Sequence, residues 1–330
     1  LPHHRDWRRR RVRRPGPRLA RHARHHPGLL PSLLAPVRRS RRPNVQRHPP
    51  IRDGRARGGL PERIGAVLMA HGDAPQGRRN DGAFHRFVKK PKSPIVHSTK
   101  DNLQVLYEDN HIVAVNKRSG DVVQGSGTGE ASLCEVVAQY VAQKYNKPGK
   151  AYIGTVHRLD RPVSGVILYA RTSKAHKRLS TMFRHREMQK TYWAVVKPAP
   201  PKTEGHVINF LAKNDKLNKS FAHDKPADNR KECELMYELK GKSDHYAFVE
   251  VLPKTGRHHQ IRATMAQLGC PIKGDVKYGA RRTNDNASIH LHARRIDFIH
   301  PVKRETISIL APPPDDVLWD AFVSLERGMR

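Results

Sequence analysis

The sequence has few cysteines and no long apolar run. Its three cysteines, Cys134, Cys233 and Cys270, lie far apart in the chain and form no CxxC pair. This pattern argues against a disulfide framework or a zinc ribbon and favours a reducing compartment, which we expect to be the cytoplasm. No apolar stretch approaches the ~20 residues that a membrane-spanning helix needs. An integral membrane protein is therefore not expected.

Acidic residues are also scarce. The 330 residues include 63 Lys and Arg but only 30 Asp and Glu, which gives a formal net charge of +33. An excess of this size predicts a polyanionic partner, most often nucleic acid, with an anionic membrane surface as the alternative. Hydrophobic residues make up 37% of the chain. Because this share is low for a globular protein, we expect part of the chain not to fold.

Residues 1–98 differ in composition from the rest. This Arg- and Pro-rich extension carries a net charge of +20, with 22 Arg and no Lys in residues 1–88. It shows no lasting helical or strand period and has too little apolar surface to offset its ordering entropy. Three interpretations compete: a basic RNA-binding arm, a transit peptide, or a segment foreign to the natural protein. We favour the last, an upstream stretch translated in error, because the first methionine is Met69.

Residues 99–326 have the patterns of one folded domain, and residues 327–330 form a short tail. Strands and helices are mixed without a strict βαβ rhythm, which predicts an α+β domain with a mixed, mostly antiparallel sheet. Ser132 and Ser173 are the expected helix caps. Strands are predicted near 103–107, 112–115, 165–171, 190–197, 231–239, 245–252 and 307–310, and helices near 131–145, 173–188, 258–270 and 315–325.

Several common catalytic motifs are missing. The chain contains no Walker A sequence, no G-x-S-x-G elbow and no HExxH. The histidines between residues 258 and 300 have no Cys or Asp cluster at ligand spacing, so no metal is predicted. Asp160 is a lone acid near Arg158, Arg161 and Arg171. Since most such aspartates are solvated ion pairs worth ~0–1 kcal/mol, spacing alone does not make it catalytic.

Three blocks change this interpretation when they are taken together. They are HRLD at 157–160 followed by SG at 164–165, KTY at 190–192, and KTGRHHQIR at 254–262 leading to GCPIKGDVKYG at 269–279. In this order they resemble the RluA family of RNA pseudouridine synthases, and the resemblance spans residues 103 to about 323. It implies a pseudouridine-synthase-like sheet with flanking helices and a central active-site cleft. It also implies an isomerase that converts specific uridines of rRNA or tRNA to pseudouridine.

The resemblance assigns roles by position. Asp160 corresponds to the nucleophile, which acts on a flipped-out uridine. Tyr192 corresponds to the tyrosine that stacks on the uracil and is a candidate for handling the C5 proton. Arg262 corresponds to the arginine that pairs with the carboxylate. The predicted RNA and substrate contacts are Arg158, His157, Ile261, His259 and Arg257.

The implied chemistry needs these residue types and nothing else. The reaction breaks the C1′–N1 bond and makes a C1′–C5 bond without a redox step or a group donor, so no cofactor is implied. The carboxylate can add to C1′, add to C6, or abstract a sugar proton, and the sequence leaves these routes open. In each route it must be ionised away from water, and a guanidinium beside it favours the charged form.

Other functions remain as rivals at this point. The chain could be an RNA-binding protein that has lost catalysis, a nucleoside hydrolase or glycosylase, or a protein that binds RNA only through its basic extension. Residues 1–100 show no pattern of the S4-type domain that many family members carry. We expect RNA as the partner, no membrane, no obligate protein partner and a monomer.

Overall fold

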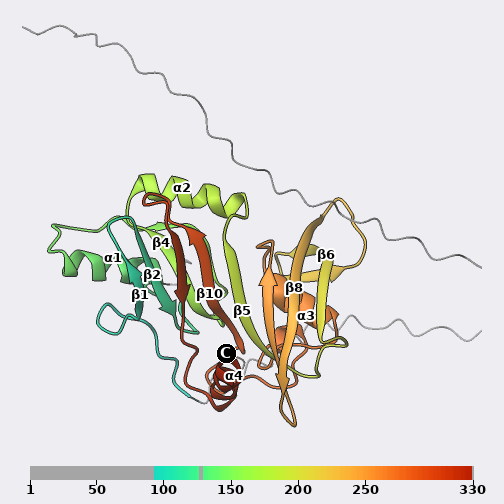
Figure 1. Ribbon diagram of the computed structural model, residues 1–330. Helices are drawn as coiled ribbons and strands as arrows, with labels where there is room; N and C mark the ends of the chain where they lie inside the picture. The colour runs from blue at the N-terminus through green and yellow to red at the C-terminus, as the bar shows by residue number, and fades with distance from the viewer. Residues whose placement is uncertain (1–92, 126–128, 329–330) are drawn as a thin grey trace, which may run out of the picture. The chain divides into compact units, whose positions relative to one another are not determined.

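The computed structural model describes residues 93–125 and 129–328 (Figure 1). The predictions made for residues 1–92 therefore lie outside the described residues. The strands are β1 (Val105–Glu108), β2 (Ile112–Lys117), β3 (Gly154–Thr155), β4 (Ser164–Ala170), β5 (Gln189–Val196), β6 (Glu204–Asn214), β7 (Lys219–His223), β8 (Arg230–Lys242), β9 (Ala247–Pro253), β10 (Leu291–Ile299) and β11 (Thr306–Leu310). The helices are α1 (Leu133–Lys144), α2 (Ser173–Arg184), α3 (Gln260–Gln267) and α4 (Val317–Gly328), with a 3₁₀ turn, η1 (Val276–Tyr278).

The described strands form one sheet in the order β1-β2-β4-β10-β5-β9-β8-β6-β7, with β3 added to β4 and β11 to β10. β4 and β10 run parallel, and the other pairs are antiparallel. The prediction of an α+β fold with a mixed, mostly antiparallel sheet is confirmed. This parallel pair lies near the middle of the sheet. β4 and β10 pair near their starts, Ser164 with His292 and Gly165 with Ala293, shortly after the HRLD segment.

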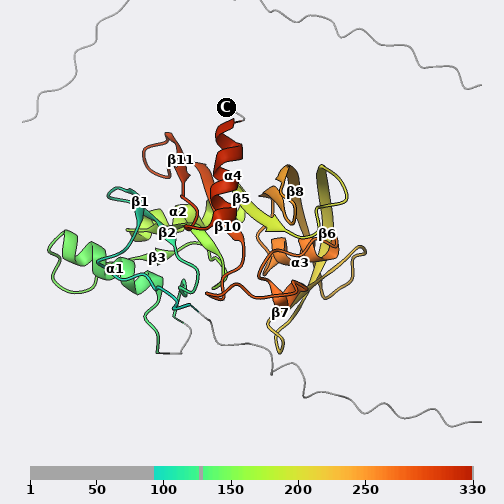
Figure 2. The same cartoon turned by 90° about the horizontal axis from the view of Figure 1, so that it is seen from below.

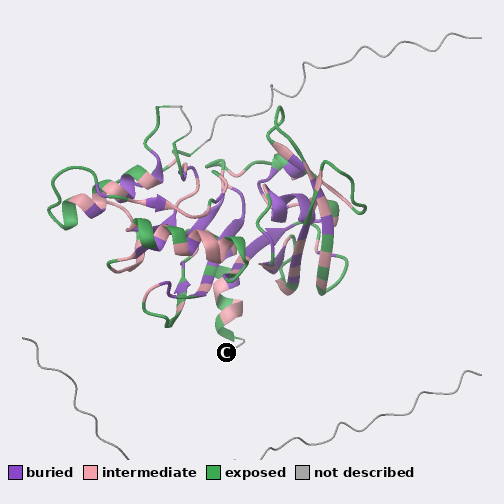
Figure 3. Ribbon diagram, turned by 90° about the horizontal axis from the view of Figure 1, so that it is seen from above, coloured by how far each residue is buried: buried purple, intermediate pink, exposed green. Residues whose placement is uncertain are grey.

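The core lies along the central strands. Every residue of β2 and β4 is buried, and the burial is densest in this half of the sheet (Figure 3). Helix α2 lies along one end of the sheet next to β4, and α4 packs beside β5 (Figure 1). Trp319 and Phe322 of α4 contact Trp193 of β5 and Phe248 of β9 in a separate cluster. No helix in the described part of the chain is long and apolar enough to cross a membrane.

Most of the predicted elements are present. Helix α1 begins after Ser132, whose side chain accepts from the Glu135 N–H while Glu135 bonds back, a complete capping box. The cap predicted for α2 is wrong by one residue. Thr172, not Ser173, is the N-cap, because its extended backbone lets its hydroxyl accept from the Ala175 N–H at 3.1 Å. The two adjacent hydroxyl residues could not be told apart by sequence.

Packed residues are found on both sides of the predicted domain limits, 99 and 326, which stay a prediction. Ser98 is buried, and its backbone and hydroxyl both bond the Asp121 carboxylate, at 3.0 and 2.6 Å. Helix α4 runs to Gly328, into the predicted tail. Four strands had no counterpart among the predictions: the two-residue β3, then β6, β7 and the central β10.

His292 connects β10 to the segment that carries the site. Its side chain is fully buried, with Nδ1 2.9 Å from the Ser164 hydroxyl and Nε2 3.1 Å from the Ala311 carbonyl. One neutral tautomer satisfies both contacts, with Nε2–H donating to Ala311 and the Ser164 hydroxyl donating to Nδ1. Burial lowers the pKa of His292 from an ordinary 6.5 to about 4.

This histidine predicts acid sensitivity of the fold. Between pH 6.5 and 4 the unfolded chain takes up a proton on His292 that the folded chain does not, so stability falls as the pH falls. A shift from 6.5 to about 4 corresponds to a loss of about 3 kcal/mol by pH 4. Urea unfolding at pH 7 and pH 4 measures the loss. In His292→Gln the difference between the two pH values should shrink by about this amount; an unchanged difference would contradict the prediction.

Candidate active site

The HRLD segment is fixed by its first residue. The backbone N–H of Leu168 in β4 donates to His157 Nε2 at 2.9 Å, and the His157 ring stacks on Phe183 of α2 at 4.6 Å. Burial lowers the pKa of His157 to about 3, so the ring is neutral and Nε2 can accept. Because β3 pairs with β4 just before this point, the imidazole extends that attachment and sets the direction in which the chain turns to Asp160.

A buried lysine holds the other side of this turn. Lys117, at the end of β2, is 1% exposed, and its ammonium donates to the carbonyls of Arg118, Arg161 and Val163 at 2.9, 3.1 and 2.8 Å. Burial lowers the pKa of Lys117 to about 7, against the opposing effect of the Asp121 and Asp160 carboxylates. Two of these carbonyls, those of Arg161 and Val163, belong to the backbone directly after Asp160, which Lys117 thus fixes.

The partner of Asp160 comes from α3. Arg262 Nη1 donates to Asp160 Oδ2 at 2.9 Å, while Nε and Nη2 bond both oxygens of Asp275 at 2.7 and 2.9 Å. Arg262 and Asp275 are buried, whereas the Asp160 side chain is 27% exposed. The Tyr278 ring lies 4.9 Å from the guanidinium carbon. A bidentate contact to Asp275 therefore holds Arg262 and leaves Nη1 for the partly exposed Asp160 carboxylate.

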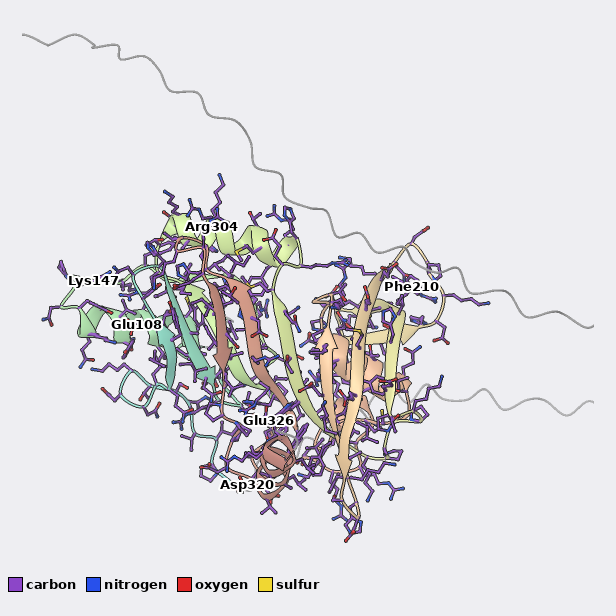
Figure 4. All side chains as sticks on the ribbon, viewed as in Figure 1. Glu108, Lys147, Phe210, Arg304, Asp320 and Glu326 are labelled. Atoms are coloured by element: carbon purple, nitrogen blue, oxygen red, sulfur yellow. The ribbon has the colours of Figure 1, made fainter. Side chains whose placement is uncertain are left out.

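The other arginines near Asp160 in the sequence have different partners. Arg171 bonds Glu108 at 3.0 Å, at the β1 edge where Figure 4 labels Glu108. Arg161 pairs with Glu130, also at 3.0 Å. Arg158 is exposed. The carboxylate is thus matched with an arginine that is distant in sequence, and its neighbours in the chain are used elsewhere or face solvent.

His259 approaches the same carboxylate oxygen. It precedes α3 with a left-handed backbone (φ 52°), a strained conformation for a residue with a side chain. Its Nε2 lies 3.5 Å from Asp160 Oδ2, and its Nδ1 lies 2.9 Å from the Tyr278 hydroxyl. That hydroxyl accepts from the Ser220 N–H at 2.9 Å and can donate to Nδ1. With burial lowering its pKa to about 3, His259 is neutral, and the tautomer in which Nδ1 accepts from Tyr278 places the ring proton on Nε2, the nitrogen 3.5 Å from Asp160 Oδ2.

Tyr192 belongs to this group as well. It lies in the middle of β5, between Ala293 of β10 and Val251 of β9, and is half-buried. Burial and then the Asp160 charge raise the pKa of Tyr192 above its ordinary value of 10. The phenol therefore keeps its proton at neutral pH, and it can donate a hydrogen bond more readily than it can act as a base.

The remaining predicted contacts are dispersed. Ile261 is buried in the main core at the start of α3. Arg257 is exposed, and its Nε donates to the Glu232 carbonyl of β8 at 3.0 Å. Arg158 faces solvent, and His157 lies behind the turn. Contact of these four residues with RNA stays a prediction.

No group of three or more metal-ligating side chains with a suitable arrangement occurs among residues 93–125 and 129–328. His290 bonds Asp316 and stacks on Trp319 at 5.2 Å, and His292 bonds Ser164. The histidines that stand out in the sequence thus have structural partners.

Comparison with known proteins places this group of residues in a family. The sequence model of the family described as RNA pseudouridylate synthase matches residues 111–267. The tRNA pseudouridine synthase C of Pasteurella multocida is 33% identical over 226 residues, which cover 63% of this chain and 90% of that protein. The chain belongs to the RNA pseudouridylate synthase family. It is therefore an isomerase that acts on uridine in RNA.

Further relatives agree with this assignment. The tRNA pseudouridine synthase C of Yersinia pestis is 34% identical over 63% of this synthase and 86% of its own length. The ribosomal large subunit pseudouridine synthase C of Vibrio cholerae is 32% identical over a stretch that covers 63% of this chain and 65% of that protein. The solved structure of human RNA Pseudouridylate Synthase Domain Containing 4 has a TM-score of 0.55 and 22% identity and covers 68% of this chain and 93% of that one. This structural likeness supports the fold.

Three residues of the synthase's site were not identified from its sequence. Asp275 and Tyr278 lie in the quoted GCPIKGDVKYG block but carry no local signal of a contact with Arg262, thirteen and sixteen positions earlier. Lys117 ends an apolar strand and looks like a surface residue that follows it. Only the sheet order, which brings β2 beside β4, could have indicated its role.

Proposed function

We propose that this synthase uses Asp160 as the nucleophile on a uridine flipped out of tRNA or rRNA. The observation that carries the proposal is the position of Asp160, a partly exposed carboxylate held by Arg262 at 2.9 Å and faced by His259 at 3.5 Å. We favour tRNA as the substrate, because the relatives of Pasteurella multocida and Yersinia pestis that are named for tRNA are aligned over 90% and 86% of their length and the Vibrio cholerae relative named for ribosomal RNA over 65%.

The residues divide the work of the isomerisation. The C1′–N1 bond breaks, the detached uracil turns, the C1′–C5 bond forms, and the C5 proton leaves for solvent or a nearby base. Asp160 adds to C1′, adds to C6 or abstracts a sugar proton, and these three routes stay open. Arg262 and His259 hold the carboxylate so that it needs no reorganisation when substrate arrives.

Tyr192 suits the flipped base. Extruding a base costs a few kcal/mol, and stacking on an aromatic ring recovers ~1–3 kcal/mol. The raised pKa of Tyr192 keeps its hydroxyl protonated, so the group first offers a hydrogen bond to the base.

Tyr192→Phe separates these roles. We expect the variant to bind RNA normally and to form pseudouridine about 10²-fold more slowly, the size typical of losing one oriented hydrogen-bond donor at the reacting group. Tyr192→Leu should weaken RNA binding as well, because the stacking surface is lost. Rates at saturating RNA and dissociation constants measure the two effects. If Tyr192→Phe is as fast as the wild type, the hydroxyl has no part in the reaction.

The product decides between a synthase and a hydrolase. Purified protein is incubated with unmodified tRNA and rRNA transcripts, pseudouridine is mapped by carbodiimide treatment and primer extension, and free uracil is measured by mass spectrometry. We expect new stops on tRNA and no free uracil. Stops confined to rRNA would show that rRNA is the substrate, and release of uracil would indicate a glycosylase. If neither pseudouridine nor free uracil is formed, the proposed function is contradicted.

A further inference from the structure

A turn that carries lysines lies next to the site. Residues 214–219 join β6 to β7, and the turn closes with Asn218 N–H donating to the Asp215 carbonyl at 3.1 Å. Lys216 is exposed, and the Lys219 ammonium lies 5.1 Å from the Tyr278 ring. Figure 2 shows α3 and β7 close together. The turn thus presents positive charge at the edge of the Asp160 group, where RNA phosphates would lie.

Lys277 adds to this charge and supports the turn. From η1 its ammonium donates to the carbonyls of Asn218 at 3.2 Å and Leu217 at 3.4 Å. The acidic residue of the turn, Asp215, pairs with Lys213. The turn therefore keeps a net positive charge.

His258 ties this turn to the catalytic group. Its Nδ1 lies 2.9 Å from the Ser220 hydroxyl and its Nε2 lies 3.1 Å from Asn218 Oδ1. The Ser220 hydroxyl also lies 2.8 Å from the His258 carbonyl, so its single proton is shared between that oxygen and Nδ1. With both ring nitrogens engaged by the hairpin, His258 has no free polar atom to offer a substrate.

The face of the same ring reaches the site. The His258 and His259 rings stack with centroids 3.8 Å apart and an interplanar angle of 20°. His259 in turn faces Asp160 Oδ2. Ser220 contributes a second link, because its N–H donates to the Tyr278 hydroxyl that bonds His259. The turn and the nucleophile are thus joined through two adjacent rings.

We propose that His258 is a positioning residue that couples the turn at 214–219, as a phosphate-binding element for substrate RNA, to His259 and so to Asp160. The inference rests on the proposed function, since it names the part of the synthase that holds RNA beside the nucleophile. Binding of RNA at the turn and alignment of the Asp160 carboxylate then both depend on the His258 side chain.

Two substitutions of His258 separate its two links. His258→Phe keeps a ring to stack on His259 but loses the bonds to Ser220 and Asn218. We expect a KM for tRNA about fivefold higher, the size of losing the one hydrogen bond that reaches the turn, to Asn218, with little change in the saturated rate. His258→Ala also loses the stack, so its saturated rate should fall about fivefold in addition. Equal KM and rate in both variants and the wild type would overturn the proposal.

Asn218→Ala tests the same link from the other end. Asn218 is exposed, but its backbone is left-handed (φ 44°), where alanine is strained, so Asn218→Gly, which removes the same side chain without that strain, is measured alongside and should give the same KM. Asn218→Ala should raise KM about as much as His258→Phe, and the double variant should be no worse than either single one, because both remove one connection. Additive effects, or an unchanged KM in Asn218→Ala, would overturn the coupling. His185→Phe, at an exposed histidine paired with Glu187, is the matched control.

The readouts distinguish this inference from the proposed function. RNA dissociation constants are measured by filter binding alongside turnover, so the effect on the turn is visible even without catalysis. If the wild type forms no pseudouridine, the proposed function fails. If the wild type is active and binds RNA no better than His258→Phe and Asn218→Ala, the inference alone fails.

Discussion

Replacing Asp160 with asparagine is expected to slow pseudouridine formation by at least about 10³-fold, the order seen when a nucleophile is removed. The amide has nearly the same shape as the carboxylate but cannot carry the negative charge or form the covalent bond. Arg262 stays in place, because its two bonds to Asp275 do not depend on Asp160. Single-turnover assays with tRNA transcripts measure the loss, and RNA binding should persist.

The control for this substitution is Asp101→Asn. Asp101 is 73% exposed and lies 3.9 Å from Lys100, so the change alters charge without touching the site. It should leave the rate unchanged, and both variants should melt near the wild-type temperature. If Asp160→Asn retained a tenth of the wild-type rate, Asp160 would not be the nucleophile.

Removing Arg262 is expected to damage the fold as well as the reaction. Arg262→Ala leaves Asp275 as a buried carboxylate without its cation, and breaking a buried pair in this way costs about 3–5 kcal/mol. Asp275 is 2% exposed and cannot turn to water without moving η1. Urea unfolding at pH 7 measures the loss, and an unfolding midpoint equal to that of the wild type would contradict the prediction.

A second change separates the two roles of Arg262. In Arg262→Ala/Asp275→Asn the uncompensated charge is gone, so we expect much of the lost stability to return. Activity should stay low, because Asp160 still lacks its partner. If the double variant recovered activity together with stability, the arginine would act only through the fold.

The residues that we propose to react were easier to find in the sequence than the residues that hold them. Asp160, Tyr192 and Arg262 stand in recognisable blocks, and in the structure Arg262 bonds Asp160, whose charge acts on Tyr192. Asp275 and Lys117 act through contacts that exist only after the sheet has formed, with the Lys117 ammonium bonding carbonyls 44 and 46 residues away. Sequence periodicity carries no information about such pairs.

The missed strands have a similar explanation. β10 (LHARRIDFI) carries two arginines in its middle, which argues against a central strand. Arg294 is nevertheless buried, because it bonds the Ala311 carbonyl at 2.7 Å and Glu326 at 2.8 Å and lies 4.2 Å from the Trp193 ring. The tertiary partners that make the strand possible come from α4 and β5. β6 was missed for a different reason. Most of its side chains are half-buried or exposed, so apolar and polar residues alternate only weakly along it.

The double attachment of Arg262 affects how inactive relatives should be recognised. Because Asp275 needs the guanidinium even when no reaction takes place, a descendant that lost Asp160 would still be selected to keep this arginine. The presence of this arginine in a related chain therefore indicates a shared fold and does not by itself indicate catalysis. The partly exposed Asp160 carboxylate stabilises no buried group in this way. If Asp160 is the nucleophile as proposed, its replacement in a relative that keeps Arg262 would indicate a protein with the same fold and no catalysis.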